Sequence, residues 1–176
     1  GSDYDGADNF TMNFTTTKSV GSTVNLIFYA LPADRSDVWI DLNGNGIKDP
    51  GEGNVQFEIS KQYTIQAQTI TIHGRVTMFG CPYNDITTLD VTKNTLLEGL
   101  YCNNNLLTSI DLSKNSELKW LECNSNQIKK AAMDDLVNSI TDRTGRVGGK
   151  YEMRWGGNEF DASHTSTLTS KNWIQK

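Results

Sequence analysis

The segment that starts at Asp41 carries oxygen-bearing side chains at alternating positions, which is the pattern of a calcium-binding loop. It reads D-L-N-G-N-G-I-K-D-P-G-E and ends at Glu52. Ca²⁺ prefers oxygen ligands at alternating loop positions, a glycine at the sharp turn and a closing carboxylate that binds through both oxygens. The predicted ligands are Asp41, Asn43, Asn45, the carbonyl of Ile47, Asp49 and Glu52.

Two interpretations of this loop stay open. With three carboxylates among its ligands, the loop predicts a structural calcium site of modest affinity, with a Kd on the order of 10⁻⁴ M. The residues before Asp41 read as a strand, and Pro50 interrupts any helix that would follow, so the loop differs from a regulatory EF-hand. The alternative is a hairpin turn rich in Asn and Gly that needs no metal.

The three cysteines are evenly spaced, at positions 81, 102 and 123, so 21 residues separate each from the next. An odd number cannot pair completely, and no histidine or second cysteine lies at metal-ligand spacing. We therefore expect buried thiols that behave as small apolar side chains. Equal spacing also indicates an internal repeat. The same period relates further residues, namely Phe79, Leu100 and Leu121, Asn84, Asn105 and Asn126, and Ile86, Leu107 and Ile128.

A repeat of this length predicts one short strand and one return segment per unit, and one unit must stack on the next to bury its apolar face. In the strand L-x-x-L-x-C the fourth and sixth positions point inward, so the third, fifth and seventh positions point outward. We expect these outward residues to form a ligand-binding concave face. The alternative is that the flanking segments fold over them, because single exposed apolar residues are ordinary. The candidate ligand-binding residues are Met78, Tyr101, Asn103, Trp120, Glu122 and Asn124.

The flanking sequence predicts elements that cover both ends of the repeats. Alternating strands are expected at 9–15, 23–30, 37–41, 54–59, 62–67 and 68–74, and a helix is expected from the apolar spacing in 129–140. The predicted organisation is a vector scar and disordered acidic tether at 1–8, an N-terminal β cap at 9–74, repeats at 75–129 and a C-terminal helix and strands at 130–176. The predicted fold class is α+β, mostly β: a short leucine-rich repeat solenoid of three 21-residue coils with an antiparallel β cap and a helix/strand cap.

Residues 76–130 resemble the cysteine-containing leucine-rich repeats of internalin-like surface proteins, and the phrase LDVTKNT resembles repeats of Bacteroidetes surface proteins. The resemblance covers roughly a third of the chain. It implies an extracellular or outer-membrane location with a lipid anchor in the full-length precursor. It also implies a non-enzymatic role in protein–protein interaction or adhesion. The small number of repeats leaves only a small surface for a partner.

Composition excludes several classes of function. The net charge is −5 and no basic stripe is present, which argues against nucleic-acid binding. No apolar run is long enough for a transmembrane segment. The sequence contains no nucleophile elbow, phosphate loop or Cys–His pair that would indicate an enzyme. We therefore expect a protein partner, with a glycan-binding module as the alternative, because Tyr101 and Trp120 offer rings that stack on sugars beside polar neighbours.

Overall fold

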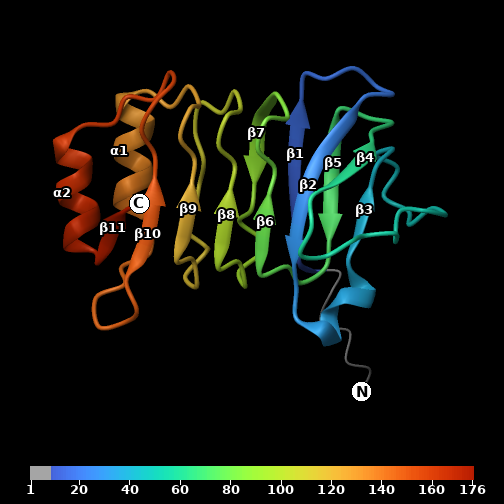
Figure 1. The fold of residues 1–176 in the computed structure, drawn as a ribbon, viewed down its shortest axis with the longest axis horizontal. Helices are drawn as coiled ribbons and strands as arrows, with labels where there is room; N and C mark the ends of the chain where they lie inside the picture. Colours follow the sequence, from blue (N-terminus) through green and yellow to red (C-terminus); the bar gives the residue numbers. More distant parts are fainter. Residues whose placement is uncertain (1–8) are drawn as a thin grey trace.

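The computed structural model describes residues 9–176 and contains two β-sheets and three short helices (Figure 1). The larger sheet has seven strands in the order β11-β10-β9-β8-β6-β2-β4, and the smaller has four in the order β3-β5-β1-β7. The tether expected at 1–8 lies outside the described residues. The strands are β1 (Thr11–Thr16), β2 (Thr23–Tyr29), β3 (Trp39–Asp41), β4 (Lys61–Thr64), β5 (Thr69–His73), β6 (Met78–Gly80), β7 (Ile86–Asp90), β8 (Gly99–Tyr101), β9 (Trp120–Glu122), β10 (Gly149–Glu152) and β11 (Trp173–Gln175). The helices are η2 (Pro32–Asp37), α1 (Lys130–Ser139) and α2 (Ala162–Ser170).

The repeat period sets the register of the larger sheet. Met78 of β6 pairs with Gly99 of β8, which pairs with Trp120 of β9, so residues 21 positions apart lie side by side. These strands run parallel, and β10 and β11 continue the sheet in the same direction. On the other side of β6, strand β2 pairs antiparallel, and β4 pairs antiparallel with β2.

Buried asparagines tie each unit to its neighbour through the backbone. The Asn105 Oδ1 accepts the backbone N–H groups of Asn84 and Ile86 at 2.9 and 3.1 Å. Its Nδ2 donates to the carbonyls of Cys81 and Cys102 at 2.9 and 3.1 Å. In the next unit, Asn126 Oδ1 accepts the backbone N–H of Leu107 at 3.0 Å. Its Nδ2 donates to the carbonyls of Cys102 and Cys123 at 3.1 and 3.0 Å. Since buried backbone groups must find partners, these amides satisfy the groups that the turn leaves free.

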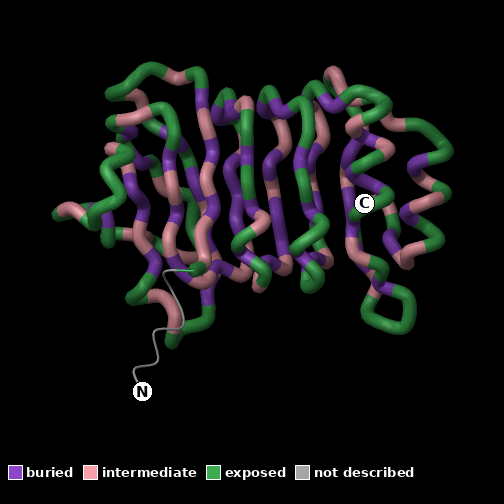
Figure 2. The backbone as a smooth tube through the Cα atoms, turned by 180° about the vertical axis from the view of Figure 1, so that it is seen from behind, coloured by how far each residue is buried: buried purple, intermediate pink, exposed green. Residues whose placement is uncertain are grey.

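One apolar core joins both sheets from Met12 to Trp173. Phe79 of β6 stacks on Phe28 of β2 at 5.3 Å and on Phe14 of the smaller sheet at 6.4 Å between ring centroids. Buried positions recur on neighbouring strands along the length of the molecule (Figure 2). The three cysteines are free thiols within this core, as the spacing predicted. Burial raises the pKa of all three thiols, which keeps them protonated at neutral pH.

The expected fold class is wrong. A short leucine-rich repeat solenoid, mostly β and with separate caps, does not describe a mixed α/β fold with sheets of seven and four strands and three short helices. The larger sheet includes β2 from the expected cap and β6 from the first repeat. In the first repeat, the return segment forms β7 because β1 pairs with it to build the smaller sheet. The later return segments pair with no strand among residues 9–176, and a strand requires a neighbour for its hydrogen bonds.

The described pairings cross the expected boundary between residues 74 and 75, through β1 with β7 and β2 with β6. The division into 9–74, 75–129 and 130–176 therefore stays a prediction. The expected helix is confirmed as α1, with Met133, Leu136 and Val137 buried. In the described part of the chain, no helix has the length and apolar content needed to cross a membrane.

One asparagine of the C-terminal region, Asn158, makes contacts like those of the repeat asparagines, although the 21-residue period does not predict it. The Asn158 Oδ1 accepts the backbone N–H of Ile128 at 3.0 Å. Its Nδ2 donates to the carbonyls of Cys123 and Met153, each at 2.9 Å. Asn158 therefore takes the place of a fourth repeat asparagine, although it lies at a longer interval along the chain than the 21-residue period.

Candidate functional site

The side chains of the larger sheet that point away from the core form a surface that we call the outer face. Its rows follow the strand register, because paired residues of neighbouring strands point to the same side. One row contains Tyr29, Met78, Gly99, Trp120, Lys150 and Ile174. The next row contains Ile27, Gly80, Tyr101, Glu122 and Glu152.

Two glycines let neighbouring apolar side chains lie against the outer face. A Cβ at Gly99 would lie 3.1 Å from Met78 Cγ, and one at Gly80 would lie 3.4 Å from Ile27 Cβ. Met78 and Ile27 therefore cover backbone that a larger residue would have occupied. This packing extends apolar surface from β2 across β6 to β8.

A shallow pocket of about 200 Å³ lies at the C-terminal side of this surface. Trp120 at its edge keeps 39% of its surface exposed. The ammonium group of Lys119 lies 4.8 Å from the centre of the Trp120 ring and pairs with Glu98 at 2.9 Å. The pocket is lined by Tyr101, Trp120, Leu121, Glu122, Lys150, Tyr151 and Lys176.

The charges around the pocket are partly paired. Lys176 forms an ion pair with Glu122, whereas Lys150 has no ion-pair partner among residues 9–176. Burial raises the pKa of the Tyr101 phenol, and the carboxylate of Glu122 raises it further. The phenol therefore stays protonated at neutral pH and can donate a hydrogen bond.

The predicted ligand-binding residues occupy two neighbouring places. Met78, Tyr101, Trp120 and Glu122 lie together on the outer face. Asn103 and Asn124 lie beyond the ends of β8 and β9, in the turns. The Asn124 Oδ1 is buried and accepts no hydrogen bond from the described residues.

Among the contributors to the outer face and its pocket that the sequence prediction missed are Ile27, Tyr29, Lys150 and Lys176. The sequence predicted the strands that carry Ile27, Tyr29 and Lys150 but not how those strands pair. The alternation in 23–30 predicted a strand, but nothing in that pattern indicated that the strand would pair with the first repeat. Lys150 follows from the predicted strand at the C-terminus only when the register of β10 with β9 is known.

The predicted calcium loop is closed by its own side chains. Asp41, which is 4% exposed, accepts the backbone N–H groups of Gly44 and Gly46, each at 2.8 Å. The amide groups of Asn43 and Asn45 both donate to Asp49 Oδ2 at 2.7 Å.

The last acidic residue of the loop, Glu52, is 6% exposed. Its two carboxylate oxygens accept the backbone N–H groups of Leu42 and Asp49, each at 2.8 Å. The described residues contain no group of three or more His, Cys, Asp or Glu side chains placed to hold a metal ion. Half of the predicted calcium ligands are amides or carbonyls rather than these residue types, namely Asn43, Asn45 and the carbonyl of Ile47.

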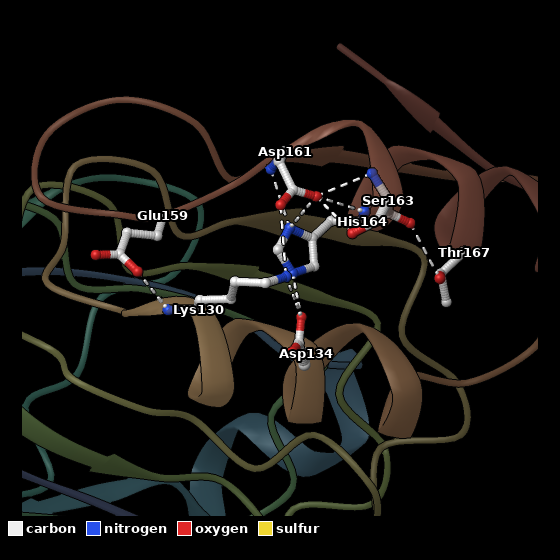
Figure 3. A network of polar contacts seen from close by, with 7 residues as sticks. All are labelled: Lys130, Asp134, Glu159, Asp161, Ser163, His164 and Thr167. Atoms are coloured by element: carbon white, nitrogen blue, oxygen red, sulfur yellow. Dashed lines mark hydrogen bonds and ion pairs between the residues drawn. The ribbon is translucent and has the colours of Figure 1, made fainter.

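A second polar cluster joins α1 to α2 (Figure 3). His164 is 2% exposed, and its Nδ1 accepts the backbone N–H of Asp161 at 3.0 Å while its Nε2 lies 2.6 Å from Asp134 Oδ1. The Lys130 ammonium lies 3.4 Å from Asp134 and 3.5 Å from Asp161. The Lys130 backbone N–H donates to Glu159 Oε2 at 2.8 Å. Nε2 of His164 thus joins α2 to α1, whereas Nδ1 helps to cap the N-terminus of α2.

In comparisons with known proteins, no family model, no curated protein and no solved structure matches the chain.

Proposed function

We propose that this chain is a non-enzymatic binding protein whose outer face contacts a protein partner. The resemblance of residues 76–130 to internalin-like surface repeats supports a place outside the cell or on the outer membrane, with a lipid anchor in the precursor. The observation that carries the proposal is the half-exposed Trp120 beside Tyr101 and Met78 on adjacent strands. Such residues supply contact area together with a polar group, and they are enriched at interface hot spots.

Protein binding is tested by screening the whole chain against extracellular proteins and repeating each positive with a Tyr101→Ala/Trp120→Ala variant. Removing both rings is expected to lower affinity by about a hundredfold or more, since each hot-spot residue contributes about 2 kcal/mol. Val147→Ala is the matched control, because Val147 is 79% exposed in the loop before β10. Equal binding by the double variant and the wild type would exclude the outer face as the interface.

A glycan is the second candidate ligand of the outer face. The pocket between Tyr101 and Trp120 favours it, since its volume of about 200 Å³ is too small for more than a compact group. The phenol, Glu122 and Lys150 surround the rings with hydrogen-bonding groups. A change in tryptophan fluorescence on addition of sugars that Trp120→Ala abolishes would favour the glycan over the protein partner.

We further propose that the loop from Asp41 to Glu52 binds Ca²⁺ in a structural role. Two observations support this: Asn43 and Asn45 already converge on Asp49, and the buried Asp41 binds the backbone of the same loop. A cation would require the amides to turn their oxygens toward it, in place of the N–H groups.

Calcium is expected to raise the melting temperature, because a ligand that binds only the folded state stabilises it. The measurement is calorimetry with millimolar Ca²⁺ against the same protein in a chelator. The Asp49→Asn variant should show a smaller rise, since it keeps an acceptor for the amides but loses a charge. Mg²⁺ serves as the control ion. An identical melting temperature with calcium and with chelator would refute the site.

A further inference from the structure

Four residues with positive φ follow the parallel strands β6, β8, β9 and β10 at the same level, and we call them the turn ladder. They are Tyr83, Asn104, Ser125 and Trp155, with φ values of 58°, 56°, 56° and 74°. The first three occupy the same position of the 21-residue repeat. Backbone hydrogen bonds connect the outer pairs, from Tyr83 N to the Asn104 carbonyl at 3.2 Å and from Ser125 N to the Trp155 carbonyl at 3.2 Å. Asn104 N donates to the carbonyl of Asn124, the neighbour of Ser125, at 3.0 Å.

The fold does not require aromatic residues at the ends of this ladder. Left-handed backbone is tolerated by asparagine and is unfavourable for bulky side chains. The middle positions carry Asn104 and Ser125, which shows what the turn itself accepts. Tyr83 and Trp155 are 69% and 63% exposed, so packing does little to offset the unfavourable backbone. Strain of this kind persists where a site uses the residue.

The two rings flank a polar strip. They are separated by three strand spacings, about 14 Å in total. Between them, at the equivalent positions after β8 and β9, lie the amide-bearing Asn104 and the hydroxyl-bearing Ser125. The Arg154 guanidinium lies 5.0 Å from the centre of the Trp155 ring. Arg154 is itself paired with Glu152 at 2.8 Å, so the strip presents little free charge.

We propose that the turn ladder binds an extended, uncharged carbohydrate chain. Sugar rings stack on Tyr83 and Trp155, because both present an apolar ring face with a polar edge. Sugar hydroxyls donate to and accept from the Asn104 amide and the Ser125 hydroxyl, which carry both donors and acceptors. A protein interface would instead gather its aromatic residues at a desolvated centre. Here the aromatic residues lie at opposite ends with polar groups between them, which suits a linear ligand.

The test is calorimetric titration of the whole protein with cellohexaose, xylohexaose and maltohexaose. At least one is expected to bind, and the corresponding monosaccharides are expected to bind much more weakly because they reach only one ring. The Tyr83→Asn/Trp155→Asn variant should lose about tenfold or more in affinity, since both ring contacts are removed. Its melting temperature should equal or exceed that of the wild type, because asparagine suits the left-handed backbone.

The controls separate this site from the outer face. Val147→Ala, a change in the exposed loop before β10, should bind the hexasaccharide as the wild type does. Each single asparagine variant should lose part of the affinity. The proposal is overturned if no hexasaccharide binds, if the double variant binds equally well, or if the double variant melts at a lower temperature. It is also overturned if Trp120→Ala abolishes sugar binding, which would place the glycan on the outer face. Loss of a protein partner, with no sugar bound, would identify the ladder as a protein interface.

Discussion

At the scale of single residues, the buried asparagines carry more of the fold than their polarity would indicate. Asn105 bonds two backbone N–H groups and two carbonyls from adjacent units. Removing one partner of a buried hydrogen bond leaves the other group desolvated and unsatisfied, which costs about 1–3 kcal/mol for each group. A polar residue at this core position is therefore a structural requirement.

Asn105→Ala is expected to lower the free energy of unfolding by about 3–5 kcal/mol, because several backbone groups lose their partners together. Denaturant unfolding followed by circular dichroism measures the change. Asn103→Ala is the matched control, since Asn103 is a partly exposed asparagine two positions earlier in the same turn. A loss for Asn105→Ala no larger than for Asn103→Ala would contradict the role of the buried amide.

At the scale of elements, the junction of α1 and α2 should respond to acid. Asp161 caps α2, and hydrogen bonds from the Ser163 hydroxyl and from the Ser163 and His164 backbone N–H groups lower its pKa from 3.8 to about 2. The hydrogen bond with the His164 side chain also lowers the pKa of Asp134. A carboxyl group with a lowered folded-state pKa contributes stability above its unfolded pKa, and that stability is lost as the pH falls toward the folded value.

The free energy of unfolding is therefore expected to decline as the pH falls from about 4 to about 2. Asp161→Asn should show a shallower decline over that window, because asparagine keeps an acceptor for the cap but does not titrate. Denaturant unfolding at a series of pH values measures both slopes. Indistinguishable slopes would show that Asp161 does not contribute to the acid response.

The elements also show what the sequence could predict. The register of Met78, Gly99 and Trp120 followed from equal spacing, since identical units stack in the same way. The pairing of β2 with β6 did not follow, because it depends on contacts such as Phe28 on Phe79 between segments with unrelated patterns. The expected strand at 54–59 is absent from the described elements: Glu58 donates to the Phe28 carbonyl but has a φ of 65°, a turn conformation.

The candidate site was likewise predictable where it depends on the repeat and unpredictable where it depends on other segments. The repeat pattern was sufficient to bring Tyr101, Trp120 and Glu122 to one face. The turn ladder was only half visible, because Tyr83, Asn104 and Ser125 share the period but Trp155 lies beyond it. Its place became evident from backbone conformation, which a residue pattern does not specify for tyrosine or tryptophan.

At the scale of the whole molecule, the continuous core predicts that the repeats depend on the N-terminal strands. A fragment of residues 75–176 would leave the edge of β6 unpaired and would remove Phe14 and Phe28 from Phe79. We expect it to lack a cooperative melting transition and the near-ultraviolet circular dichroism of the full chain. Adding a peptide of residues 1–74 should restore both signals. A fragment that melts cooperatively at the temperature of the full chain would show that the repeats form an independent domain.

The buried asparagine contacts have a consequence for how such a chain changes length. Asn105 bonds the Cys81 carbonyl just as Asn126 bonds the Cys102 carbonyl, so each unit presents the surface that the next unit needs. A gene duplication that inserts one 21-residue unit would therefore leave both ends of the molecule unchanged. It would move Trp155 away from Tyr83 by one strand spacing, about 4.8 Å. If the turn ladder binds carbohydrate as proposed, the number of units sets the distance between the two rings, and variants with more units would select longer carbohydrate chains.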